Sequence, residues 1–189
     1  MLDRLRLVAL LSLGLLPCAV LAQVQTFRVE PAKSTVHWDL PDKLHAVNGS
    51  FRVQSGSLTF DPAAATMGGK IIVDAGSGKS GNDTRDQKMN DEVLQSSAFR
   101  TVTFAPKHYT GTLAATGDST IMVEGAFTLL GKPHDLVVPM AIHREGRAIT
   151  AKGTFEVPYV QWGLKDPSKL ILRVGKEVKI DLDLVGETD

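Results

Sequence analysis

The sequence predicts an all-β protein, specifically an up-and-down antiparallel barrel of eight strands with one short helix. From residue 25 onward, short runs alternate apolar and polar residues, which is the pattern of strands with one buried face. Gly, Pro, Asp and Asn separate these runs. Only one stretch has helical spacing, whereas a parallel sheet needs a helix at every crossover. A two-sheet sandwich is the alternative architecture.

The first 22 residues have the features of a cleaved secretory signal. Arg4 and Arg6 precede an apolar stretch, and Val20-Leu21-Ala22 is a typical small-residue cleavage site. We therefore expect cleavage after Ala22 and a mature domain of residues 23–189 that is exported to the periplasm or the medium.

Two other interpretations of this segment are less favoured. The apolar run from Leu7 to Leu16 is far shorter than the ~20 residues that cross a bilayer. Lipid modification at Cys18 is disfavoured because Pro17 stands where such sites usually have a small residue. No stable membrane insertion is expected after cleavage.

The composition of residues 23–189 excludes several classes of partner and chemistry. Cleavage removes Cys18, the only cysteine, so the mature domain has neither a disulfide nor a thiolate. Its formal charge falls from zero to about −1, because Asp3, Arg4 and Arg6 are lost with the signal. That balance argues against nucleic acid and anionic membranes, which select concentrated positive charge.

The strands are expected where apolar residues recur at every second position. Four such sets each share one face of a strand: Val36, Trp38 and Leu40; Ile121, Val123, Phe127 and Leu129; Leu136, Val138, Met140 and Ile142; Val178, Ile180, Leu182 and Leu184. The further candidate strands are residues 25–29, 69–75, 101–109 and 149–159.

Residues 46–60 predict a bent strand, because their apolar positions change parity. Phe51 and Val53 are at odd positions, whereas Leu58 and Phe60 are at even ones. A β-bulge near Ser55 would keep both sets facing the interior.

A repeated pattern of Gly, small, Phe, polar and aliphatic residues begins at Gly49, Gly125 and Gly153. Each Gly is on the same face as its Phe, so it either leaves room for a ring or a ligand or marks a bulge.

The one helix is expected to begin at Thr84 and to end before Ser96. Thr84 to Gln87 has the form of a capping box, and Met89 with Val93 gives a short apolar stripe.

No motif for catalysis or for a nucleotide is present. The five histidines show no metal-ligand spacing, and no serine-nucleophile elbow or helical zinc motif occurs. The run Gly76 to Ser80 lacks the first Gly of a phosphate loop, since Val73 is at that position. We therefore expect no catalytic residue, no metal and no cofactor.

One long segment carries a family resemblance. Residues 80–104 read SGNDTRDQKMNDEVLQSSAFRTVTF, with LHAVNGSFRVQSGSLTFDP before them and GAFTLLGKPHDLVVP and VPYVQWGLKDPS after them. These segments resemble the YceI-like family of periplasmic polyisoprenoid-binding proteins over nearly the whole mature chain. The most specific part is Ser-Gly-Asn-x-x-Arg-Asp at residues 80–86. The chain departs from the common pattern at Ser80, where a Thr is usual, and at Lys88 and Met89, where His and Leu are common. These changes bear on the identity of the ligand and not on the fold.

The resemblance implies a lipocalin-like barrel whose apolar interior holds an isoprenoid or fatty chain. An eight-stranded barrel either fills itself with side chains or holds one slender ligand. The residues expected to form the apolar wall are Phe51, Leu58, Phe60, Val73, Phe104, Phe127, Leu129, Val138 and Phe155. The alternative for each of them is ordinary core packing.

Polar groups beside the short helix are expected to bind the head of the ligand. These are Asn82, Arg85 and Lys88, which suit a phosphate or carbonyl group. Arg85 and Asp86 have a structural alternative, in which they tie the helix to the rim, and this is the favoured role for Asp86.

The function predicted is therefore a periplasmic, non-enzymatic carrier of a polyisoprenoid, a quinone precursor or a similar amphiphile. A small lipid is the expected partner, and a homodimer is compatible with the sequence. Two alternatives stay open. One is an enzyme or redox-stress protein that uses the barrel as a reaction pocket. The other is a solid barrel that serves as an interaction module.

Overall fold

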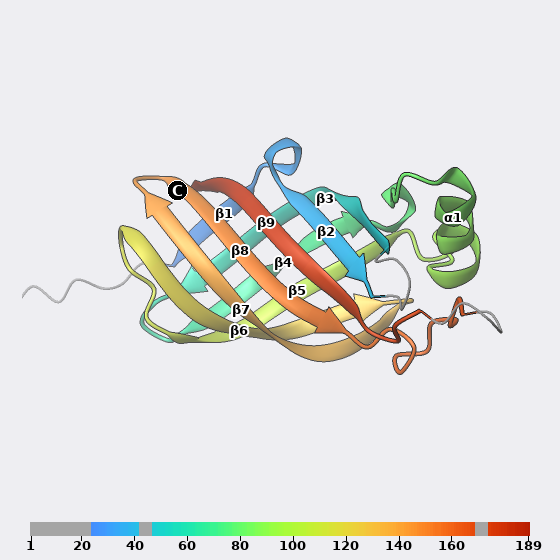
Figure 1. The fold of residues 1–189 in the computed structure, drawn as a ribbon. Helices are drawn as coiled ribbons and strands as arrows, with labels where there is room; N and C mark the ends of the chain where they lie inside the picture. Colours follow the sequence, from blue (N-terminus) through green and yellow to red (C-terminus); the bar gives the residue numbers. More distant parts are fainter. Residues whose placement is uncertain (1–23, 42–46, 169–173) are drawn as a thin grey trace, which may run out of the picture.

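A single antiparallel sheet closes on itself in the computed structural model, which describes residues 24–41, 47–168 and 174–189 (Figure 1). The strands are β1 (Gln25–Val29), β2 (Thr35–Leu40), β3 (Val47–Asp61), β4 (Thr66–Asp74), β5 (Thr101–Gly111), β6 (Gly117–Leu129), β7 (Lys132–Glu145), β8 (Ala148–Val157) and β9 (Val178–Thr188). The helical segments are two 3-10 turns (Pro31–Lys33 and Ala75–Ser77), α1 (Asp83–Lys88) and a π-helical turn (Met89–Val93).

Strands β2 to β9 pair in chain order, and β9 pairs with β2 to close the barrel. β1 and β2 share one position, because both lie between β3 and β9. In β1, Phe27 pairs with Leu58 and Thr188, whereas in β2, Val36 pairs with Phe51. The strands therefore fill eight positions, which confirms the predicted eight-stranded, lipocalin-like barrel over the sandwich.

The break between β1 and β2 is built around Pro31 and Ser34. Pro31 has no backbone N–H and begins the 3-10 turn that interrupts the ladder. The buried Ser34 hydroxyl donates to the Glu30 carbonyl at 2.9 Å and accepts from the Val185 N–H at 3.0 Å. The side chain thus replaces ladder bonds that the turn removes.

The predicted bulge in β3 is present. The register between β3 and β4 shifts between Val53 and Ser55. As a result Val53, Leu58 and Phe60 are all buried although their positions differ in parity. The long β3 bends there and pairs first with β2 and then with β1.

A second bulge, in β5, was not predicted. The pairing of β5 with β6 shifts between Pro106 and His108, so that Phe104, Pro106 and Tyr109 all face inward. Proline in a strand is confined largely to edges and bulges, so Pro106 was the available signal.

The helix begins earlier than the sequence predicted. The cap is Asn82, whose side chain accepts from the Arg85 N–H at 3.0 Å, and not the capping box at Thr84 to Gln87. After α1, the π-helical turn continues through Met89 and Val93, so both residues of the predicted apolar stripe are helical. Of the described helices, none has the length and apolar character required to span a membrane.

The two ends of the barrel differ. At one end, short turns at residues 62–65, 112–116 and 146–147 join consecutive strands. At the other end lie residues 75–100, which include α1, and the segment 158–168 after β8 (Figure 1). These two segments surround the end at which the candidate site opens.

Candidate functional site

The barrel interior is hollow. A cavity of about 810 Å³ runs through it, and inward-facing residues from all nine strands line it. The four sets of alternating apolar residues predicted from the sequence face this interior, and all of their members except Leu136 line the cavity. Leu136 instead packs, partly buried, against the same core. The interior is therefore not filled by side chains from end to end.

All nine residues predicted as the apolar wall line this cavity. They are Phe51, Leu58, Phe60, Val73, Phe104, Phe127, Leu129, Val138 and Phe155. They come from β3, β4, β5, β6, β7 and β8, so strand alternation, together with the bulge in β3, brings them together. Leu58, Phe60, Leu129 and Val138 also belong to the buried core, so packing and lining are not exclusive roles.

Inward-facing glycines accept neighbouring side chains. A Cβ at Gly49 would lie 2.7 Å from the Trp38 ring, and one at Gly125 would lie 2.8 Å from the Phe104 ring. At Gly153 the close neighbour is the Met140 sulfur, at 2.4 Å. The repeated glycines therefore let neighbouring side chains approach closely and, at Gly49 and Gly125, also the backbone carbonyls of Lys79 and Ala105.

The cavity reaches solvent beside α1. Asn82, Arg85 and Lys88, the predicted head-group residues, line it at this point and are exposed. We call the region lined by Asn82, Thr84, Arg85 and Lys88 the mouth. It is the most polar part of the lining that the structure describes.

Asp86 ties α1 to the preceding loop. Its buried carboxylate accepts from the Ser80 N–H at 2.9 Å and from the Ser80 hydroxyl, and it lies 3.6 Å from the Lys79 ammonium. The hydrogen bond from the Ser80 hydroxyl, helped by the Ser80 N–H and by Lys79, holds the pKa of Asp86 below its usual value despite burial. This is the structural role favoured for Asp86.

Arg85 shares in this network and still faces the cavity. Its Nε donates to the Ser80 hydroxyl and its Nη2 to the Ser80 carbonyl, both at 2.8 Å. Lys88 differs, because no described residue forms an ion pair or hydrogen bond with it. Lys88 is therefore the mouth cation that is available to a ligand without breaking an existing contact.

The segment after β8 forms the other side of the mouth. Leu164 is buried there, and the Tyr159 hydroxyl donates to the Gly175 carbonyl at 2.7 Å. Burial, with a smaller effect of Asp166, raises the pKa of Tyr159 to about 12, so the phenol stays protonated. Lys165 pairs with Glu92 and links this segment to the π-helical turn.

Aromatic contacts fix the position of this segment on the barrel. Trp162 stacks on His134 with ring centroids 4.1 Å apart and lies 5.7 Å from Phe127. Phe127 in turn meets Phe155 edge-on at 6.1 Å. The wall and the segment at the mouth thus form one packed unit.

Several lining residues were missed as site residues at the sequence level. Trp38 was recognised as inward-facing but was not assigned to the wall. Tyr109 was hidden by the bulge at Pro106. Leu164 lies outside any regular element, so no periodicity marks it.

The described lining holds little that is suited to catalysis. It contains no Asp, Glu, His or Cys, and its titratable side chains are Arg85, Lys88, Tyr109 and Tyr159. Across the described residues, no group of three or more potential metal ligands comes together. The arrangement offers an apolar tunnel with a cationic rim, which is suited to holding an amphiphile.

Comparison with protein families identifies one match, the YceI-like domain, over residues 27–186. Comparison with curated proteins gives no significant match.

Several solved structures have the same fold. Burkholderia cenocepacia BcnA has a TM-score of 0.68 and 22% identity, covering 83% of this chain and 98% of its own. A polyisoprenoid binding domain from Saccharophagus degradans, implicated in plant cell wall breakdown, also has a TM-score of 0.68, with 17% identity and coverage of 86% and 98%. Campylobacter jejuni YceI protein has a TM-score of 0.62 and 19% identity, with coverage of 77% and 87%.

Proposed function

This chain belongs to the YceI-like domain family, and from that premise we propose that it is a periplasmic carrier of one long-chain amphiphile. The ligand class is a polyisoprenoid, a quinone precursor or a similar molecule. The observation that carries this proposal is the cavity of about 810 Å³, which is apolar along its length and opens beside cationic side chains. A structurally similar domain is described as polyisoprenoid-binding, which supports the same ligand class.

The energy of binding would come mainly from the tail. Each buried methylene contributes about 0.8 kcal/mol, whereas association costs on the order of 4 to 15 kcal/mol. A tail of about twenty carbons therefore offsets the association cost without any specific polar contact.

The head group would stay at the mouth. Lys88, which has no partner among the described residues, would pair with a phosphate or carboxylate, and Arg85 and Asn82 lie within the same rim. A polar head left in the apolar tunnel would lose its hydrogen bonds to water, which costs several kcal/mol. Tail-first entry avoids this cost.

The geometry favours binding over the alternatives. An enzyme needs a titratable cluster in the pocket, and the described lining offers no carboxylate or imidazole to act as a base. A purely structural interaction module would have a filled interior, whereas this interior is hollow.

Native mass spectrometry of the protein purified from its own host tests the proposal. One bound amphiphile per chain is expected, and solvent extraction should then release and identify it. A ligand-free mass after gentle preparation, with no amphiphile in the extract, would refute the carrier function.

The same sample tests export. Residues 1–22 lie outside the described part of the structure, so their removal stays a prediction. The denatured mass should correspond to a chain that begins at Gln23, recovered from the periplasmic fraction. An intact Met1 in the cytoplasmic fraction would contradict it.

A further inference from the structure

We propose that the closed end of the cavity sets the length of chain that the protein accepts. This inference rests on the proposed function and adds to it a specificity determinant. The residues concerned are Phe27 and Phe60, which we call the floor.

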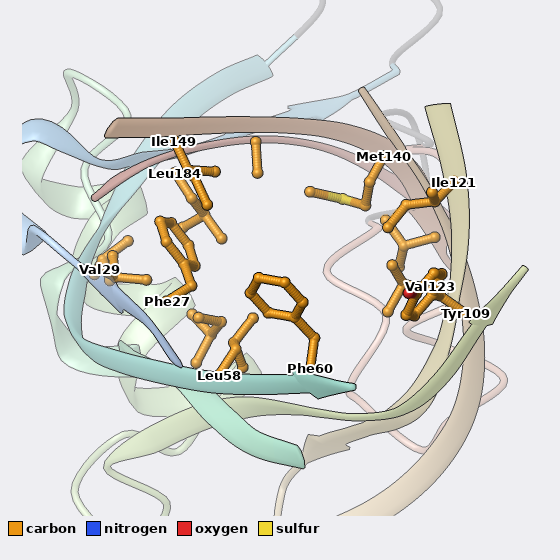
Figure 2. Packing of buried hydrophobic residues seen from close by; sticks show 14 of the residues in the cluster. Phe27, Val29, Leu58, Phe60, Tyr109, Ile121, Val123, Met140, Ile149 and Leu184 are labelled. Carbon is orange, nitrogen blue, oxygen red and sulfur yellow. The ribbon is translucent and has the colours of Figure 1, made fainter. Parts of the chain in front are cut away.

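The floor consists of two aromatic rings that project into the barrel. Figure 2 shows Phe27 and Phe60 inside the ring of strands, across from Met140, Ile121 and Tyr109. Phe27 and Phe60 are each only 5% exposed. Both also line the cavity, so the hollow extends to these rings.

The position of Phe27 is fixed by its neighbour on β9. A Cβ at Gly186 would lie 2.8 Å from Phe27 Cε2, so the ring packs directly on the glycine backbone. Ala65 and Leu113, at two turns of this end, pack against the same core cluster. The turns at this end thus contribute apolar side chains to the same core that contains the floor.

The two ends of the cavity differ in exposure. The polar lining residues at the mouth are exposed, whereas the lining side chains beside the floor, such as Tyr109 and Ile121, are 5% and 3% exposed. A chain that enters at the mouth therefore meets packed side chains at the floor. Inserting further carbons into a packed core is destabilising, so the floor limits how far the chain can enter.

The cavity volume gives the chain length at which the ligand reaches the floor. A water-sized group occupies about 30 Å³ in a liquid, so 810 Å³ holds roughly 25 chain carbons, or about five isoprene units. Carbons beyond this number stay at the mouth, in contact with water.

The test is a series of straight-chain primary alcohols from dodecanol upward, competed against a fluorescent fatty acid on the mature protein. Affinity should rise about fourfold for each added methylene while the chain fills the cavity, and then level off. We call the chain length at which the affinity levels off the break, and the cavity volume places it at roughly 25 carbons.

Two variants should move the break in opposite directions. Phe60→Ala removes a ring from the floor and should shift the break to chains about three carbons longer. Ala151→Phe places a ring into the hollow from β8, where Ala151 lines the cavity, and should shift the break to shorter chains. Because this second variant fills empty space, it carries the test even if Phe60→Ala does not fold.

Phe127→Ala is the matched control, since it removes the same ring from the wall near the mouth. It widens the cavity beside the mouth and leaves the closed end where it was, so it should weaken binding of all the longer alcohols without moving the break. An affinity that climbs without levelling off, or a break that neither Phe60→Ala nor Ala151→Phe moves, overturns the inference while leaving the carrier function intact. If the wild-type protein binds none of the alcohols, the carrier function itself fails.

Discussion

Asp86 and Lys88, two residues apart at the mouth, have different tasks because their surroundings differ. Asp86 is buried, accepts two hydrogen bonds from Ser80 at Oδ1 and lies 3.6 Å from the Lys79 ammonium, so it holds the loop and helix together. Lys88 is exposed and, within the described residues, unpaired. From the sequence, both residues could be recognised only as polar. Their burial in the structure distinguishes the structural role of Asp86 from the ligand-binding role proposed for Lys88.

Asp86→Asn should lower the free energy of unfolding by about 1 to 3 kcal/mol at neutral pH, because it weakens hydrogen bonds to a buried charge. The folded-state pKa of Asp86 is depressed. Its stabilisation is thus fully present above the unfolded-state pKa of about 3.9 and is lost as the pH falls through the lower folded-state pKa. In urea unfolding, the difference in the free energy of unfolding between wild type and variant should become smaller below about pH 4. A difference that stays constant with pH would contradict this role of Asp86.

Lys88→Ala should reduce affinity for a long-chain fatty acid by about two- to fivefold, since an exposed ion pair contributes up to about 1 kcal/mol. Affinity for the alcohol of equal length should not change. Lys70→Ala is the control, because Lys70 is exposed on β4 and does not line the cavity. Equal losses for acid and alcohol in a competition assay would argue against a charge-based role for Lys88.

At the level of elements, bulges decide which residues reach the cavity. The β3 bulge was predicted because Phe51 and Leu58 are apolar positions of opposite parity. The β5 bulge escaped prediction because only Pro106 and Tyr109 mark it, and Tyr is common on either face of a strand. Alternation at every second residue thus predicts which residues line the cavity, except beyond a bulge, where the inward-facing positions change from odd to even numbers or the reverse.

Inserting one Ala after Ser55 should shift the parity of β3 beyond the bulge and turn Leu58 and Phe60 out of the barrel. The free energy of unfolding should fall by at least about 3 kcal/mol, the usual cost of losing one large buried side chain. Ser55→Ala keeps the chain length and should change the free energy of unfolding by less than about 0.5 kcal/mol. Denaturant titration compares the two variants, and a mild effect of the insertion would show that the bulge absorbs the extra residue.

For the whole molecule, the sequence predicted the closed barrel and the wall, because both follow from alternation along strands. It did not predict that Leu164 and the π-helical turn would frame the mouth, since irregular segments have no periodic signal. The cavity was expected only from the family resemblance, because Phe27 or Phe60 looks the same in a filled or a hollow barrel. The cavity volume depends on all the inward-facing side chains together, so it cannot be predicted from any single residue.

The central claim is that a lipid chain lies inside the barrel, and quenching of Trp38 tests it most directly. Trp38 lines the cavity and is 5% exposed, and Trp162→Phe leaves it as the only tryptophan. A fatty acid brominated on its chain should quench Trp38 emission at one equivalent, while aqueous iodide should barely affect it. Binding of the brominated lipid with no loss of Trp38 emission would place the chain outside the barrel and contradict the account.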